Sequence, residues 1–182
     1  MKTILISGTA MLALAFPAGA VAQDTAPSPA KNAAKTCDAL RTASGEANFK
    51  LAYGTNKSKS NAFGKCVAKQ TKVEEAAVKA SKNTCKTEQD DANFAAAHGG
   101  KTFAQFYGTN KNGKNAYGKC VSAKAKAKNA EETKTLVKAG KTCKAERKEL
   151  GREAFTAKYG GKANAFGKCI SAEAKADKAA RS

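Results

Sequence analysis

Three observations predict that this chain is all-α and consists of three small disulfide-stapled helical repeats joined by helical spacers. The same order of landmarks occurs three times along the chain. The six cysteines fall two to each copy. The stretches between the copies, residues 67–83 and 121–139, are rich in Ala, Lys and Glu and lack Pro and Gly, which favours helix. Only 7% of the residues are aromatic, so we expect several small cores rather than one large core.

Residues 1–22 have the pattern of a secretory signal peptide. Lys2 supplies a positive charge, residues 4–16 are mostly apolar, and Ala-Val-Ala at 20–22 is a small-residue cleavage site. The apolar stretch is too short and too interrupted to span a membrane. We therefore expect a protein that is secreted or held non-covalently at the cell surface, without membrane insertion. Residues 23–35 contain two prolines and are expected to form a disordered leader.

The three copies share an internal layout. Each begins with Thr-Cys, continues with two aromatic residues four apart and a following Gly, and ends with Asn-Ala-(Phe/Tyr)-Gly-Lys-Cys. Copies of this length are near the lower limit for independent folding. The predicted segments are a first unit (36–69), a spacer (70–83), a second unit (84–124), a spacer (125–141), a third unit (142–175) and a tail (176–182).

We expect three short helices in each unit. In the third unit, Thr142 is a candidate N-cap for a helix over 143–150, and Gly151 breaks it. Gly45 and Gly99-Gly100 are expected to break the first helix of the other two units at the equivalent place. A second helix carries the aromatic pair on one face. A third helix is expected to begin at the Asn of the closing motif, as N-cap. These residues are Asn61, Asn115 and Asn164. The second unit's extra residues, around 95–100, are expected to form a surface loop.

The cysteines are expected to pair within units. In an exported protein they indicate disulfides rather than metal or redox chemistry. A straight helix through the 16 residues from Cys143 to Tyr159 would run about 24 Å, so the Gly break must fold it back to bring two cysteines within bonding distance. Each disulfide should stabilise its unit by about 3 to 4 kcal/mol. The predicted pairs are Cys37–Cys66, Cys85–Cys120 and Cys143–Cys169.

The Tyr-Gly-Thr-Asn and Asn-Ala-Phe-Gly-Lys-Cys-Val signatures resemble a repeat of exported bacterial proteins that have no assigned activity. The resemblance covers most of residues 36–175. It implies a recurring module, and it implies no catalytic residue, ligand or substrate. The third copy departs from it, because its turn at 160–164 is shorter than the Gly-Thr-Asn pattern.

The residues available for chemistry favour a protein that is not an enzyme and has no cofactor or metal. His98 is the only His, which leaves His-based catalytic and metal sites without their usual parts. It precedes two glycines, so we expect a role at a helix end. Carboxylate doublets such as Glu74-Glu75 do not recur between copies and are expected on solvated faces. The aromatic residues are expected to fill the cores rather than stack on bases.

The candidate anion-binding region is the turn that leads into the closing motif of each unit. It carries lysines just before a helix N-terminus, whose free N–H groups favour anions. The alternative is a Gly/Asn turn with solvated lysines. The turn lysines are Lys57, Lys111 and Lys114, and the lysines of the following first helical turn are Lys65, Lys119 and Lys168.

The chain has 33 Lys and Arg against 15 Asp and Glu, a formal charge of +18 spread over all three units. Such a charge predicts salt-sensitive, weakly selective attraction to polyanions. We expect an exported non-enzymatic protein that associates electrostatically with anionic envelope or extracellular polymers, with cell-wall polymer favoured over nucleic acid. The alternative is a protein-interaction scaffold at the cell surface or in the medium, in which the charge serves solubility.

Overall fold

The described residues, 28–160 and 164–181 of the computed structural model, form helices and no strands, which confirms the all-α prediction. The predicted signal peptide lies outside them. The helices are α1 (Pro29–Ser44), α2 (Glu46–Tyr53), α3 (Ala62–Asp90), α4 (Phe94–Ala97), α5 (Phe103–Tyr107), α6 (Ala116–Lys158) and α7 (Ala165–Ala179). None of these helices is both long and apolar enough to cross a membrane.

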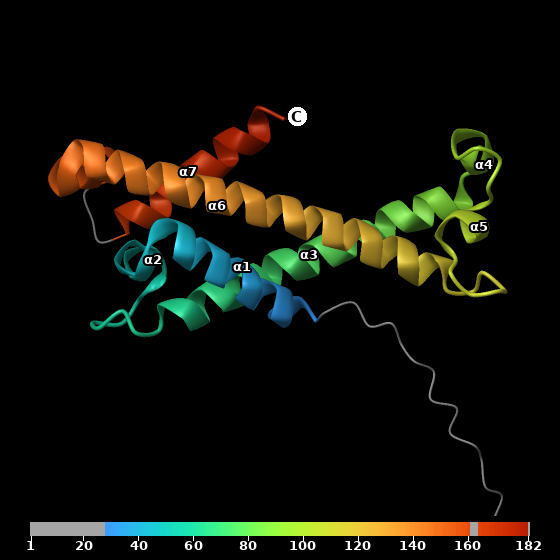
Figure 1. Ribbon diagram of the computed structural model, residues 1–182, viewed down its shortest axis with the longest axis horizontal. Helices are drawn as coiled ribbons and strands as arrows, with labels where there is room; N and C mark the ends of the chain where they lie inside the picture. Colours follow the sequence, from blue (N-terminus) through green and yellow to red (C-terminus); the bar gives the residue numbers. More distant parts are fainter. Residues whose placement is uncertain (1–27, 161–163, 182) are drawn as a thin grey trace, which may run out of the picture.

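Two long helices form the axis of the molecule (Figure 1). Helix α3 has 29 residues and α6 has 43, and each continues without interruption through one predicted spacer. The prediction of helical spacers is therefore confirmed. The short helices α4 and α5 lie at one end of the axis, whereas α1, α2 and α7 lie towards the other (Figure 1).

Three disulfides join the cysteines in the pairs that the repeated pattern predicts. In each pair the Cα atoms are 6.0 Å apart, and all six cysteines are fully buried. Disulfides persist in oxidising compartments, so these bonds indicate a location outside the cytoplasm. The pairs are Cys37–Cys66, Cys85–Cys120 and Cys143–Cys169.

Glycines break the first helix of the first and third units, as predicted. The break expected at Gly99-Gly100 is wrong, because α3 already ends at Asp90 and α4 lies between it and these glycines. Gly45 separates α1 from α2 with φ 81°, and Gly151 interrupts α6 with φ 76°. The left-handed region costs Gly little, which explains its use at both breaks. The predicted N-cap at Thr142 is wrong, because α6 enters the third unit already helical and the first helix of that unit has no separate beginning.

Asn61 and Asn115 occupy the predicted N-cap positions, but their side chains do not form the hydrogen bonds of an N-cap. The Asn61 Oδ1 accepts hydrogen bonds from the N–H groups of Thr55 and Asn56, at 3.0 and 3.4 Å. The Asn115 Oδ1 does the same for its own turn, accepting from the N–H of Thr109 at 3.1 Å. These side chains therefore close the turn that precedes the helix, and neither bonds to the helix N–H groups.

Residues 29–35, expected in the disordered leader, form the start of α1. Pro29 stands in the first turn of the helix, where its fixed φ suits the helix and its missing N–H costs nothing. Ala33 is fully buried, so this turn is held by packing as well as by propensity. The expected disorder over these residues is therefore wrong.

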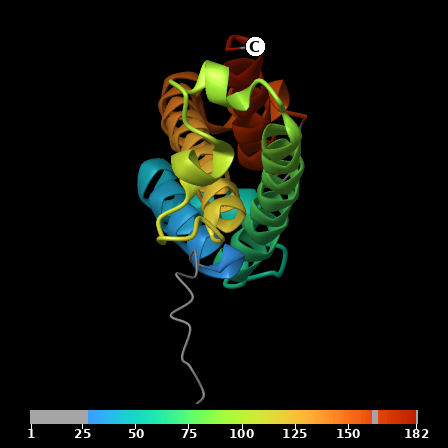
Figure 2. The same cartoon turned by 90° about the vertical axis from the view of Figure 1, so that its right-hand side faces the viewer.

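The first and third units share one core, whereas the second has its own. The shared core draws on α1, α2, α3, α6 and α7, and its larger members include Leu40, Phe49, Phe155, Phe166 and Ile170. The second unit's core is small and belongs to the end of the molecule that carries α4 and α5, which faces the viewer in Figure 2. Its buried residues are Cys85, Phe94, Phe103, Ala116 and Cys120.

The extra residues of the second unit are not the expected plain loop. They include the one-turn helix α4, whose Phe94 is only 4% exposed and packs edge-on against Phe103 at 5.4 Å. His98 ends this helix, and its ring stacks on Phe94 at 3.8 Å. Its Nδ1 lies 2.7 Å from the Phe94 carbonyl oxygen, as expected for a helix-end role. The insertion thus adds a buried aromatic side chain to the second unit, whose core is not shared with the other units.

Candidate functional site

Two of the predicted anion-binding lysines line one cavity, which lies between the first and third units. Lys65 belongs to the first turn of α3 and Lys168 to the first turn of α7. We call this cavity of about 420 Å³ the lysine cavity, and none of its lining residues is acidic. They are Ala52, Tyr53, Lys65, Lys69, Asn164, Gly167, Lys168 and Ser171.

Close packing of α2 against α7 forms the lysine cavity. A Cβ at Gly167 would stand 3.0 Å from the Ala52 carbonyl oxygen, so the absence of a side chain allows this approach. Burial raises the pKa of Tyr53 to about 12, although a hydrogen bond with Gln70 opposes the rise. Tyr53 is therefore neutral at physiological pH, and no described residue that lines the cavity carries a negative charge.

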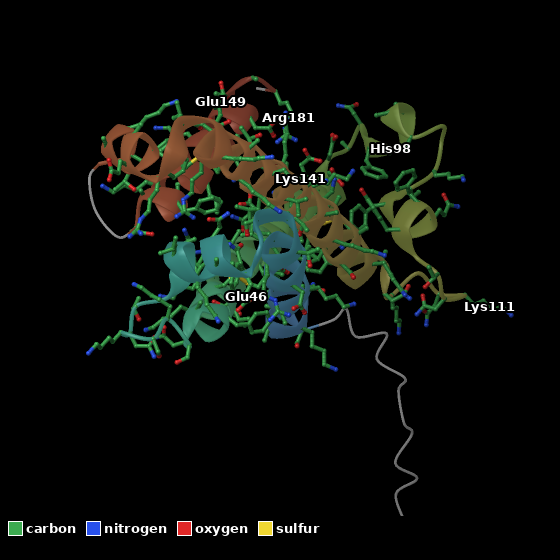
Figure 3. All side chains as sticks on the ribbon, turned by 60° about the vertical axis from the view of Figure 1, so that its left-hand side comes forward. Glu46, His98, Lys111, Lys141, Glu149 and Arg181 are labelled. Atoms are coloured by element: carbon green, nitrogen blue, oxygen red, sulfur yellow. A yellow bond between two sulfur atoms is a disulfide. The ribbon has the colours of Figure 1, made fainter. Side chains whose placement is uncertain are left out.

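The other predicted lysines do not reach this cavity. Lys57 is exposed on the turn before α3, and Lys111 and Lys114 are exposed on the turn before α6. Lys119 lies in the first turn of α6, within the second unit. Figure 3 shows Lys111 projecting from the end of the molecule that also carries His98. The six lysines are thus spread over several places and do not form one site.

A larger open cavity of about 830 Å³ lies between α6 and the segment where α1 meets α2. We call it the basic groove. Five of its lining side chains are cationic and none is acidic. The lining residues are Thr42, Ala43, Asn48, Lys141, Lys144, Ala145, Arg147, Lys148 and Arg152.

The register of α6 gathers these cations. Lys141, Lys144 and Lys148 are three and four residues apart, a spacing that places side chains on one helix face. Arg147 donates a hydrogen bond to the Asn48 Oδ1, which ties α6 to α2. Arg152 follows the break at Gly151 and lines the same groove.

The cations of the groove differ from several other lysines of α6, which form ion pairs with carboxylates. Lys124 pairs with Glu88 at 2.8 Å, Lys138 with Asp177 at 2.6 Å, and Lys158 with Glu146 at 2.7 Å. No carboxylate among the described residues forms an ion pair with the groove's lysines or arginines. The groove cations are Lys141, Lys144, Arg147, Lys148 and Arg152.

Sequence reasoning missed the groove, although a signal was present. Lys141, Lys144, Lys148 and Arg152 recur at intervals of three or four, which is a basic helix face. The expected helix start at Thr142 divided that face between a spacer and a unit. The opposite wall comes from α1 and α2, and the sequence contained no indication that the first unit packs on the third.

The expectation that Glu74 lies on a solvated face is wrong. It is only 4% exposed, and its Oε2 accepts a hydrogen bond from Asn129. Burial raises its pKa, while a hydrogen bond with Asn32 opposes the rise. Lys35 and Lys126 line the same small cavity of about 370 Å³. Glu74 therefore belongs to the junction of α1, α3 and α6, where its hydrogen bonds are structural.

Two other carboxylates form hydrogen bonds with the Tyr of the aromatic pair in their unit. Glu88 and Glu146 each stand three residues after the opening Cys, and each accepts a hydrogen bond from the unit's Tyr hydroxyl. The distances are 2.9 Å from Tyr107 and 2.8 Å from Tyr159. Burial opposes their charged forms, but hydrogen bonds from Lys and Tyr outweigh it and hold both pKa values below the ordinary value for Glu. The first unit has Leu40 at this position, buried in the shared core.

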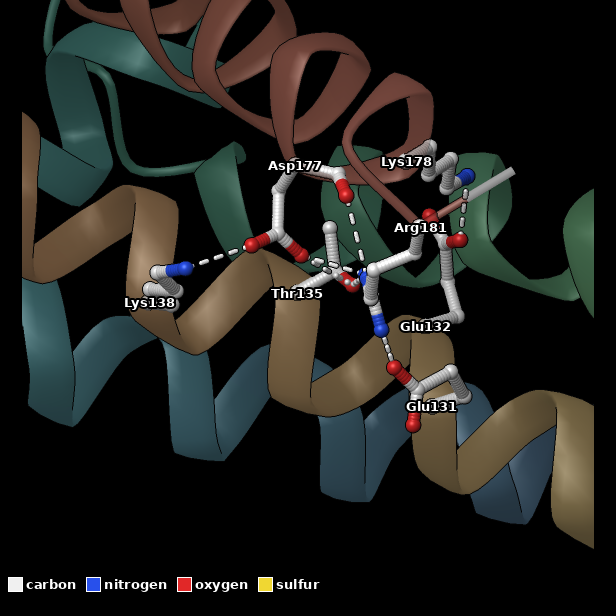
Figure 4. A network of polar contacts seen from close by, with 7 residues as sticks. All are labelled: Glu131, Glu132, Thr135, Lys138, Asp177, Lys178 and Arg181. Carbon is white, nitrogen blue, oxygen red and sulfur yellow. Dashed lines mark hydrogen bonds and ion pairs between the residues drawn. The ribbon is translucent and has the colours of Figure 1, made fainter.

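A polar network attaches the end of α7 to α6 (Figure 4). Asp177 accepts hydrogen bonds from Lys138 and Thr135, and Arg181 pairs with both Asp177 and Glu131. Lys178 pairs with Glu132 at 2.5 Å. The charges of this cluster are satisfied by one another, so it explains why the chain's last described turn is docked and offers little attraction to a ligand.

The aromatic residues of the described chain mostly fill cores, as predicted. Phe49 and Phe155 are each 1% exposed and Phe166 is 2% exposed. Phe106 is the exception at 46%, and its ring meets His98 edge-on at 4.6 Å. The basic groove has no aromatic residue in its lining.

Comparison with protein-family models, with curated proteins and with solved structures finds no match to this chain. The resemblance to an exported bacterial repeat therefore stays a prediction. The described residues contain no group of three or more His, Cys, Asp or Glu placed to hold a metal ion.

Proposed function

We propose that this protein is an exported, non-enzymatic basic protein that associates electrostatically with anionic envelope or extracellular polymers. The observation that carries the proposal is the basic groove, where five cationic side chains line one open cavity without an acidic residue. A polymer with many charges contacts several such side chains at once, so individually weak attractions add. The lysine cavity supplies a second region of the same kind.

We also propose that the three units are copies of one structural module. The shared features support this: each unit is closed by one disulfide, and the two aromatic rings of its pair lie against each other with centroids 4.9 to 5.1 Å apart. Copies of a basic module multiply weak contacts with a repetitive polymer without requiring a specific pocket in each copy. The chain's single His supports a non-enzymatic role, because its ring is engaged by Phe94 and Phe106.

The experiment is co-sedimentation of the oxidised, exported protein with isolated cell envelopes, before and after their anionic polymers are stripped. We expect binding that falls steeply between low and above-physiological salt and that disappears on stripping. Binding that is indifferent to both treatments, or no binding at low salt, would overturn the proposal.

One observation favours the alternative of a protein-interaction scaffold. Phe106 is exposed beside the buried Phe94 and is part of an aromatic cluster on the second unit. Exposed aromatic residues are enriched in protein interfaces. If envelope binding persists at high salt and is lost in Phe106→Ala, the scaffold becomes the better account. A polyanion-binding protein should tolerate this substitution.

A further inference from the structure

We propose that the basic groove is the principal contact, and that it takes a linear chain of anionic groups through charge alone, without stacking on bases or sugar rings. This inference rests on the proposed function and assigns it to one surface. It also shifts the site from the turn lysines, which the sequence suggested, to a face that exists only because the first and third units pack together.

The shape of the groove favours a chain over a single anion. Intervals of three and four residues separate neighbouring cations of α6 by about 4.5 to 6 Å along the helix axis. Lys141 to Lys148 therefore spans about 10 Å, and Arg152 continues the row beyond the kink at Gly151. A polymer whose charges recur along its length meets several of these side chains together, whereas a compact anion meets one or two.

The charge state of the groove favours binding at little cost. Lys141, Lys144, Lys148 and Arg152 have no carboxylate partner among the described residues, so no existing ion pair must break. Arg147 is already held by Asn48, which orders one guanidinium at the groove wall before any ligand arrives. Arginine presents a planar fork of donors that suits phosphate oxygens.

The composition of the groove argues against recognition of nucleobases. Proteins that hold single-stranded nucleic acid stack bases on aromatic side chains. The uncharged lining residues are Thr42, Ala43, Asn48 and Ala145, none of which offers a ring. The chemistry that fits is a flexible polyanion held by its backbone, such as a phosphodiester polymer without bases.

The test measures binding of end-labelled linear polyphosphate to the oxidised, exported protein over a salt series. The groove variant carries Lys141→Gln, Lys144→Gln, Lys148→Gln and Arg152→Gln. We expect its slope of log K against log salt to become shallower by about 3, since each lost contact removes about 0.7 to 0.9. At 0.1 M salt the affinity should fall about 100-fold or more.

A control variant removes the same number of charges elsewhere. It carries Lys72→Gln, Lys79→Gln, Lys82→Gln and Lys101→Gln, all at exposed positions outside both cavities. We expect its slope to change by less than about 1. Equal losses in the two variants would overturn the groove assignment but leave the proposed polyanion association standing. Weak, salt-independent binding by the unmodified protein would overturn both.

A second pair of variants adds a charge without removing a cation. Thr42→Glu places a carboxylate in the groove, whereas Thr87→Glu places one on α3, at a matched site. Both threonines are exposed, and each hydroxyl donates to the carbonyl of the residue four positions earlier. We expect Thr42→Glu to weaken polyphosphate binding at least fivefold more than Thr87→Glu. Equal effects of the two substitutions would contradict the proposal. This test does not depend on the folding of the groove variant.

The nature of the ligand is tested with two phosphodiester probes of equal length, oligo-dT and its abasic backbone. Charge-only binding predicts affinities within about threefold of each other. Oligo-dT binding more than tenfold tighter would show that bases are recognised and would overturn this part of the proposal. Inorganic phosphate should compete poorly with polyphosphate at equal phosphate concentration, and effective competition would indicate a single-anion site.

Discussion

The shared core of the first and third units and the separate core of the second differ in size, although all three units carry the same landmarks. Among the described residues, fourteen buried residues form the shared core and five form the second unit's core. Burial of apolar area is the main favourable term in folding. The second unit therefore depends more on its disulfide and on the Phe94 insertion, whereas the other two units stabilise each other.

Removal of single disulfides should reveal the largest difference in stability between the second unit and the shared-core region. In the chain-entropy model, opening Cys85–Cys120 or Cys143–Cys169 costs about 4 kcal/mol. In Cys85→Ser/Cys120→Ser, we expect residues 94–107 to lose amide protection while α1, α2 and α7 keep theirs. In Cys143→Ser/Cys169→Ser, the shared core should keep α7 partly protected. Hydrogen exchange measures both, and uniform loss over the chain in either variant would contradict the comparison.

Phe94→Ala should destabilise the second unit by about 3 kcal/mol, at the lower end of the range for a buried Phe. The ring is 4% exposed, and no shared core compensates for its loss. Phe106→Ala is the control, and at 46% exposure it should cost less than 1 kcal/mol. Urea unfolding followed by near-ultraviolet circular dichroism measures both, and equal effects would show that α4 is not part of the core.

Two glycine substitutions should have opposite signs. A Cβ at Gly140 would stand 2.8 Å from the Leu40 Cδ1, where α1 crosses α6, so Gly140→Ala should destabilise by about 1 to 2 kcal/mol. Gly118 in the second unit has no heavy atom within 4 Å of its Cβ position. Gly118→Ala should therefore stabilise its helix by up to about 1 kcal/mol. Thermal unfolding of both variants is the measurement, and a stabilising Gly140→Ala would contradict the close crossing.

The smallest expected effect is the change in stability with pH that two glutamates cause. The lowered pKa of Glu88 means that its contribution is present above its unfolded pKa and is lost as the pH falls through its folded pKa. The raised pKa of Glu74 means that ionisation of this group opposes folding, because burial penalises its charged form. Glu88→Gln should lower stability at pH 7 by less than about 1 kcal/mol, and Glu74→Gln should not lower it. The loss caused by Glu88→Gln should shrink as the pH falls through the folded pKa of Glu88, which urea unfolding over a pH series from 7 downwards tests.

The sequence predicts local features well because they depend on nearby residues. The absence of Pro and Gly anticipates the continuous helices through both spacers. The positions of Gly45 and Gly151 anticipate the breaks. The recurring Cys positions anticipate all three disulfides. In each case the decisive residues lie within one unit or spacer.

The features that the sequence misses depend on contacts between distant segments. Residues 29–35 are helical partly because Ala33 is buried, and no composition rule conveys that burial. Leu40 of the first unit packs against Gly140 of the second spacer, and Asn48 of the first unit bonds with Arg147 of the third. Without that packing the basic face of α6 has no opposite wall. The turn lysines stood out only because they recur, whereas the groove residues occur once.

The central claim is that polyanions bind the shared-core region through the basic groove. Lysine acetylation footprinting of the oxidised, exported protein, with and without saturating polyphosphate at physiological salt, tests it without any mutation. The account predicts strong protection of Lys141, Lys144 and Lys148, with Lys72, Lys79 and Lys101 unchanged. Even protection of all exposed lysines, or protection confined to the turn lysines Lys111 and Lys114 of the second unit, would contradict it.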